Sequence, residues 1–336
     1  MIDFRYHVVS IIAVFLALTV GLVLGASFLS SAQIDILKGQ ITSANNAKSD
    51  LENQNRTLDT QKKQLQDYID ETKDNLVANQ LYNDYVVVVR AAGSDQGSVE
   101  SVLALAKQAS ATITADVTIN PAFTDPTSAD QLATLLLDYA PTGQSLAGDD
   151  TVTQAMDLLS EALTVQAGAG PNTTPPSSVA PTTMTPEWSI KTLKAFRDIG
   201  VITVTVMPNA ASMTKPTAAF IAAPGKVAPD AETLAYVTLA QALRASGVGP
   251  VIGGTAVAAG EGGTIAAVLK NATTARTVST VDDMDQTAGQ VAVVFVLYQE
   301  SANPQAAAGH YGTTGSTDGL LPKLPSLPAV PSPGVG

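Results

Sequence analysis

The side chains of this sequence that are able to do chemistry gather near its carboxyl end. Asp282, Asp283 and Asp285 follow a short apolar segment, and His310 stands between glycines in the segment 309–312. Carboxylates in such a group bind hard cations or serve as an acid and base pair. The alternative is a solvated loop after a strand. We take Asp282, Asp283, Asp285 and His310 as the candidate metal ligands.

Composition excludes most other chemistry. The 336 residues include no cysteine, which removes thiolate metal sites, iron–sulfur clusters, disulfides and cysteine nucleophiles. The spacing of the glycines between residues 253 and 263 is neither GxGxxG nor GxxxxGK(S/T), and no lysine stands where a β-phosphate would need one. No nucleophile and base pair and no cofactor fingerprint appears in the sequence. We therefore expect a protein that is not an enzyme and that has no evident cofactor.

A dedicated copper site is not visible either. Cu(I) prefers thiolates and thioethers, and Cu(II) prefers imidazoles. The chain has only two histidines, His7 and His310, at opposite ends. Its six methionines form no spaced motif; they stand at positions 1, 156, 184, 207, 213 and 284.

The charge balance excludes one large class of partner. The chain carries 18 basic and 30 acidic residues, for a net charge of −12. Such a chain repels phosphate backbones, so we expect no nucleic-acid partner. Charged residues make up 14% of the chain and apolar ones 45%, which is more apolar than an ordinary soluble domain.

The first element that the sequence predicts is an apolar segment at the amino terminus. Residues 8–29 contain no charge, and as a helix they reach about 33 Å, enough for a hydrocarbon core of about 30 Å. We predict a retained membrane anchor over residues 1–32. A cleaved signal peptide is the alternative, although the apolar stretch is longer than usual for one. The short segment before it, with Arg5, favours a cytoplasmic amino terminus and places the rest of the chain on the outer side.

Small residues recur every four positions in this anchor. Ala17, Gly21 and Gly25 form one stripe, and the segment 21–25 is a GxxxG motif. Two helices with such stripes approach closely and pack backbone to backbone. The alternative is that glycine is simply common in membrane helices.

Heptads follow the anchor and predict a coiled-coil stalk over residues 33–82. Leucine recurs at d, and the a positions mix β-branched with polar residues, which favours a parallel dimer. A buried Asn55 would fix its register. The alternative is one amphipathic helix packed on its own domain. The predicted coiled-coil core is Ile34, Leu37, Ile41, Leu51, Asn55, Leu58, Leu65, Ile69 and Leu76.

Alternating strand and helix patterns predict a Rossmann-like α/β domain with a largely parallel sheet over residues 83–300. A buried-strand run at 86–89, a helix near 98–109 and a strand at 112–119 form a β–α–β unit. Residues 167–186 hold five prolines and no basic residue, which predicts a Pro/Thr-rich surface loop or linker. Further strands are predicted at 201–206, 218–222, 251, 274–281 and 290–297, and further helices at 128–139, 151–164, 187–198, 231–245 and 264–269.

Beyond residue 300 the periodicity ends. Residues 301–336 predict a flexible Pro-rich tail, in which prolines recur every third position from Pro322 to Pro331. Such spacing also allows one proline face in a polyproline helix.

Two blocks of sequence resemble one known family. The opening RYHVVS at 5–10, with 13–18 and the two anchor glycines, is similar to the start of the actinobacterial copper transporter B family. So are STVDDMD at 279–285, Gly289 and GHYG at 309–312. The resemblance covers roughly residues 1–315, because anchor, stalk, α/β domain and tail occur in the same order.

That resemblance implies a cell-envelope protein of an actinobacterium with a role in copper transport, efflux and homeostasis. In mycobacteria the family is described as an outer-membrane channel that limits internal copper. Relatives are also linked to septal cell-wall work, with a membrane partner and a peptidoglycan hydrolase under their control. Copper enters only through this resemblance.

Two hypotheses follow for function. In the first, the protein is a component of copper transport, although its single apolar span offers no polar pore. In the second, it is a dimeric coiled-coil scaffold in the membrane that recruits or regulates an envelope or cell-division partner at the wall. The small-residue stripe, the heptads and the proline tail fit the second mechanism.

Overall fold

The computed structural model describes residues 4–141, 145–166, 184–314 and 318–322. The chain divides into two compact units, residues 1–67 and 68–336. Residues 167–183 of the predicted loop, and residues 315–317 and 323–336 of the predicted tail, lie outside the described residues.

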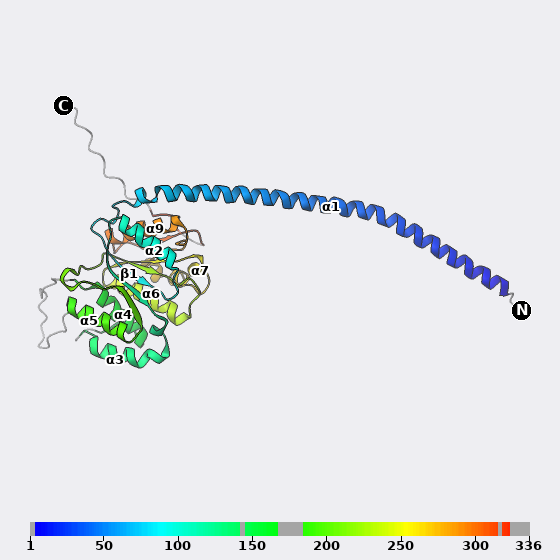
Figure 1. The fold of residues 1–336 in the computed structure, drawn as a ribbon. Coiled ribbons are helices and arrows are strands. Elements are labelled where there is room, and N and C mark those ends of the chain that lie inside the picture. Colours follow the sequence, from blue (N-terminus) through cyan, green and yellow to red (C-terminus); the bar gives the residue numbers. More distant parts are fainter. Residues whose placement is uncertain (1–3, 142–144, 167–183, 315–317, 323–336) are drawn as a thin grey trace, which may run out of the picture. The chain divides into compact units, whose positions relative to one another are not determined.

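Helix α1 (Phe4–Val77) is one α-helix of 74 residues (Figure 1). No proline interrupts the chain before residue 121, so nothing in the backbone forces an earlier end. Within the first unit the large apolar side chains between Tyr6 and Leu24 and between Ile34 and Leu65 are exposed, and the segment Arg5–Gly25 is long and apolar enough to cross a membrane. Helix is therefore present both in the predicted anchor segment and in the predicted stalk region.

The second unit contains a seven-stranded sheet in the order β3-β2-β1-β4-β5-β6-β7. Every neighbouring pair is parallel except β2 and β3, which confirms the predicted α/β class with a largely parallel sheet. The strands are β1 (Tyr85–Arg90), β2 (Thr112–Ile119), β3 (Ile202–Val206), β4 (Ala218–Ala222), β5 (Gly249–Gly253), β6 (Ser279–Val281) and β7 (His310–Tyr311).

Helices cover both faces of this sheet (Figure 1). One face packs against α2, α9 and the end of α1, and the other packs against α3, α4, α5, α6 and α8. Both cores are built mainly from aliphatic side chains, because central parallel strands are buried on both faces. The helices after α1 are α2 (Gln96–Gln108), α3 (Ala129–Tyr139), α4 (Thr151–Thr164), α5 (Pro186–Asp198), α6 (Asp230–Ala245), α7 (Ala256–Ala259), α8 (Thr264–Lys270) and α9 (Thr287–Ala302).

Four short 3₁₀ turns complete the described elements. They are η1 (Pro121–Phe123), η2 (Pro126–Ser128), η3 (Ala210–Ser212) and η4 (Thr274–Arg276). The strand predicted at 274–281 is therefore the turn η4 followed by the three-residue strand β6.

The prediction of a strand at 290–297 is wrong, because these residues lie inside helix α9. The run is rich in β-branched valine, which favours strands in sequence-based reasoning. However, Val291 to Leu297 are all buried, so the helix shows no polar face and no 3.6-residue period. Tertiary packing overrides the local preference here.

The predicted boundary between domain and tail at residue 300 lies too early. Helix α9 continues to Ala302, and β7 then pairs in parallel with β6. Tyr311 is buried in the core with α2 and α9. A two-residue strand flanked by glycines leaves no periodicity in the sequence, which is why the pattern suggested a tail.

Candidate functional site

Asp282, the first candidate ligand, lies at the carboxyl end of β6 and is buried. Its carboxylate accepts hydrogen bonds from the backbone amides of Thr313, at 2.8 Å, and Thr314, at 3.2 Å. Burial raises the pKa of Asp282, and the two amides oppose that rise. The carboxylate thus holds the loop that follows β7.

Gly312 makes this contact possible. Its φ of +135° lies in the region that favours glycine, and a Cβ there would overlap the Asp282 carboxylate. The sequence blocks 279–285 and 309–312 are therefore neighbours in space. They contain the paired strands β6 and β7 and the loops that follow these strands.

Asp283 is buried against the first turn of α9, where Gly289 leaves room for it. Its Oδ1 has no hydrogen-bond partner among the described residues. Burial, with a smaller effect from the charge of Asp282, raises the pKa of Asp283 to about 6. Asp285, by contrast, is exposed and accepts a hydrogen bond from Gln286.

His310 uses both of its ring nitrogens within the domain. Nε2 lies 2.8 Å from the carbonyl oxygen of Ala275, and Nδ1 lies 3.0 Å from the hydroxyl of Thr280. Because a carbonyl only accepts, Nε2 donates, and in the neutral ring Nδ1 accepts from Thr280. The imidazole therefore ties β7 to β6 and to η4.

The candidate ligands lie on or directly after the neighbouring strands β6 and β7, but as described they do not form a metal-binding cluster. Within the described part of the chain, no group of three or more histidines and carboxylates is arranged to hold a metal ion. Asp282 and His310 instead make hydrogen bonds that attach β7 and its loop to the sheet.

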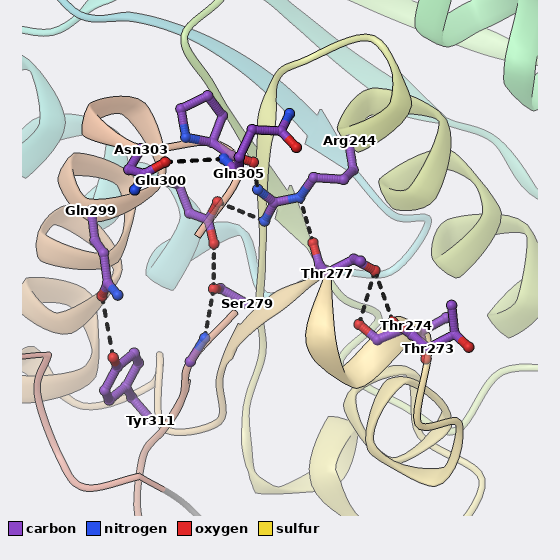
Figure 2. Close-up of polar contacts among 12 residues, drawn as sticks. Arg244, Thr273, Thr274, Thr277, Ser279, Gln299, Glu300, Asn303, Gln305 and Tyr311 are labelled. Carbon is purple, nitrogen blue, oxygen red and sulfur yellow. Dashed lines mark hydrogen bonds and ion pairs between the residues drawn. The ribbon is translucent and has the colours of Figure 1, made fainter. Parts of the chain in front are cut away.

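A buried polar network lies at the opposite, amino-terminal edge of this part of the sheet, around Arg244 and Glu300 (Figure 2). Arg244, at the end of α6, donates to the Glu300 carboxylate at 2.6 Å and to the carbonyl of Thr277 at 2.6 Å. It also donates to the carbonyl of Pro304. Both charged side chains are at least nine-tenths buried, so the pair is protected from solvent.

Ser279 extends this network to β7. Its hydroxyl donates to Glu300 at 2.5 Å and accepts from the amide of Gly309 at 3.0 Å (Figure 2). Burial raises the pKa of Glu300, and Ser279 and Arg244 oppose that rise. Sequence analysis missed Arg244, because a single arginine at the end of a helix carries no recognisable spacing. The network fixes the segment from α9 to β7.

A second buried ion pair joins β1 to β2. The Arg90 guanidinium donates twice to Asp116, at 2.8 and 2.6 Å, and once to Glu100 at 2.7 Å. Asp116 and Glu100 raise the pKa of Arg90 against the effect of burial. Bidentate geometry of this kind fixes the relative position of the two strands.

All but one of the predicted packing residues of the anchor and stalk are exposed. A Cβ built at Gly21 or Gly25 meets nothing within 4 Å, so the small-residue stripe is open to a partner. In the stalk Leu51 and Leu58 are 59% and 60% exposed, although they are the d residues of the heptad. The predicted a residue Asn55 is exposed as well. Ile69 is partly buried, and the other apolar members of the predicted core, Ile34, Leu37, Ile41, Leu65 and Leu76, are exposed.

A helix of membrane-spanning length followed by an α/β domain fits a membrane-anchored protein. A family model described as "Copper transport outer membrane protein, MctB" matches residues 1–322, and the chain belongs to this family. The family predicted from the two sequence blocks is thereby confirmed.

Curated relatives extend over nearly the whole chain. The copper transporters MctB of Mycobacterium tuberculosis and Mycobacterium bovis are each 28% identical over 325 residues, which cover 93% of this chain and 96% of theirs. The copper transporter MctB of Mycobacterium leprae is 27% identical over 328 residues, or 94% of this chain and 96% of its own.

Proposed function

We propose that this protein acts in copper transport at the cell envelope and helps to keep the copper content of the cell low. The observation that carries this proposal is the match of residues 1–322 to a family described as a copper transport protein. The names of the mycobacterial relatives support it. In this role copper is the cargo of the protein.

We further propose how the chain is placed. The segment Arg5–Gly25 spans a membrane as a retained anchor, with the amino terminus in the cytoplasm and the α/β domain on the outer side. Its length and apolar composition support the anchor. The positive charge of Arg5 before the apolar run supports the orientation.

In the proposed assembly two copies pair in parallel through α1. Exposed leucines at d positions cost solvation free energy in a monomer, and a coiled coil buries them. The open stripe of Ala17, Gly21 and Gly25 would pack in the same dimer. The predicted heptads and the predicted small-residue stripe therefore support the same parallel dimer.

A second candidate function is a scaffold that recruits or regulates an envelope or cell-division partner at the wall. The observation that favours it is the exposed stalk, because it offers binding surface and the described span offers no polar pore. In this function the copper content of the cell would not depend on the protein.

The experiment that separates the two functions uses a strain without the gene. The strain receives the wild-type gene or the Leu51→Lys/Leu58→Lys variant, and cell copper and cell separation are measured together. Copper transport predicts that the wild-type gene lowers cell copper and that the variant fails to do so. Normal copper in the empty strain, together with unseparated cells, would support the scaffold and contradict the transport role.

A further inference from the structure

One cavity of the domain combines soft ligand atoms with an uncharged lining. It measures about 240 Å³ and lies at the amino-terminal edge of the sheet, where β1 and β2 begin and β3 ends. Met207 and Met213 both line it, together with Tyr85, Thr112 and Leu163. Met213 is 8% exposed, and Met207 is partly buried against the same core.

The fold of the β3–β4 connection brings the two methionines to this cavity. After Val206 the chain makes the turn η3, in which the Asn209 side chain accepts from the amide of Ala211 at 3.0 Å. The amide of Ser212 then donates to the carbonyl of Asn209 at 3.1 Å. The turn η3 lies between Met207 and Met213, and these residues, six positions apart, both line the cavity. Sequence spacing alone did not reveal this pairing.

The chemistry of the lining selects among metal ions. No residue that lines the cavity carries a charge; the polar groups are hydroxyls and the Asn209 amide. Calcium and magnesium require carboxylates or many oxygen ligands, and zinc sites use thiolates, imidazoles and carboxylates. Two thioethers are neutral, soft ligands that suit the monovalent Cu(I).

The geometry points to a Cu(I) site formed by the thioether sulfurs of Met207 and Met213. This inference rests on the proposed function in copper transport and names the oxidation state of the cargo. Two neutral ligands bind Cu(I) less tightly than thiolates do, which suits an ion that must be released again. Silver(I), which has the same charge and softness, should occupy the same site.

The other described methionines are placed differently. Met156 is fully buried within α4, and Met284 is buried beside Gly253. Met184 lines a separate cavity that also contains Glu161 and Lys215. Met184 therefore provides a matched control, because it is a methionine at another cavity of the same domain.

The test titrates the full chain in detergent with Cu(I), under ascorbate, against a chromogenic Cu(I) chelator. We expect the wild type and Met184→Leu to bind with the same affinity. Met207→Leu/Met213→Leu should bind at least tenfold more weakly, and its thermal unfolding should be unchanged, because leucine and methionine have similar volumes. X-ray absorption at the copper edge should show sulfur neighbours in the wild type that the double variant loses.

Three results would overturn the site. They are no Cu(I) binding by the wild type, equal binding by the double variant, or a copper spectrum without sulfur neighbours. In those cases the two methionines only fill an irregular gap in the core. The proposed function fails by a separate observation, namely normal cell copper in a strain without the gene, so the two failures are distinguishable.

Discussion

Gly312 lies directly against the carboxylate of Asp282, and this contact joins the loop after β7 to the end of β6. The two residues are 30 positions apart in the sequence, and each belongs to one of the blocks that identify the family. Their relationship gives those blocks a structural meaning, because one supplies the acceptor and the other supplies the space for it.

Gly312→Ala should therefore destabilise the domain by about 3 kcal/mol, since the new methyl group would displace Asp282 from its amide partners. Gly93→Ala is the matched control. Gly93 also has a positive φ, of +70°, but a Cβ there meets nothing within 4 Å, so about 1 kcal/mol is expected. Thermal unfolding of the full chain in detergent measures both. Equal losses would contradict the contact.

The buried ion pair between β1 and β2 gives a second prediction. Asp116→Asn leaves the Arg90 guanidinium buried without a charged partner on β2, and we expect a loss of about 3–5 kcal/mol in the free energy of unfolding. Glu100→Gln removes the other partner, whose side chain is 63% exposed, and should cost less than about 1 kcal/mol. Similar losses in the free energy of unfolding for the two variants would show that burial does not decide how strongly each carboxylate stabilises Arg90.

The sequence predicted the architecture well wherever periodicity was strong. The apolar run, the heptads and the strand at 86–89 all correspond to described helix or sheet. It failed at α9, where uniform burial removes the helical period, and at β7, where two residues are too few to show one. Both failures have the same cause, because neighbouring elements and not the local pattern determine these segments.

The candidate site was predictable only in part. The sequence grouped Asp282, Asp283 and Asp285 after a strand but assigned His310 to a flexible tail, whereas the structure places His310 on β7, paired with β6. It did not predict that Asp282 and His310 would be engaged by backbone groups and by Thr280. Nor did it predict the Arg244–Glu300 pair, whose members are 56 positions apart and share no motif.

Glu161 gives the domain a pH-dependent stability. Burial, with a smaller effect from Asp157, raises its pKa to about 7 in the folded state, above the ordinary 4.5. The folded state therefore holds its proton more tightly. The resulting stabilisation is fully present below about pH 4.5 and is lost as the pH rises through about 7, by about 3 kcal/mol in total.

Glu161→Gln removes this titration, so the variant should be more stable than the wild type above pH 7 and should lose that advantage near pH 5. Unfolding free energies at pH 5, 6, 7 and 8 measure the difference. A constant difference between Glu161→Gln and the wild type across this range would contradict the raised pKa.

The stalk provides a prediction about assembly. Leu51→Lys/Leu58→Lys places two charges at d positions of the proposed coiled coil, so we expect the dimer to dissociate at least tenfold more readily. Asn53→Lys/Thr60→Lys places the same charges at the outward f positions of the same heptads and should leave the dimer intact. Light scattering of the full chain in detergent gives the mass of each. A wild type that is monomeric, or a d-position variant as dimeric as the control, would contradict the parallel pair.

The proposed function in copper transport means that the protein lowers the copper content of the cell. The most direct test is the total copper of cells without the gene, compared with the parent strain, in copper-supplemented medium. Cell copper should rise clearly without the gene, and the intact gene should reverse this rise. Copper equal to that of the parent strain would contradict the claim and leave the envelope scaffold as the function of this chain.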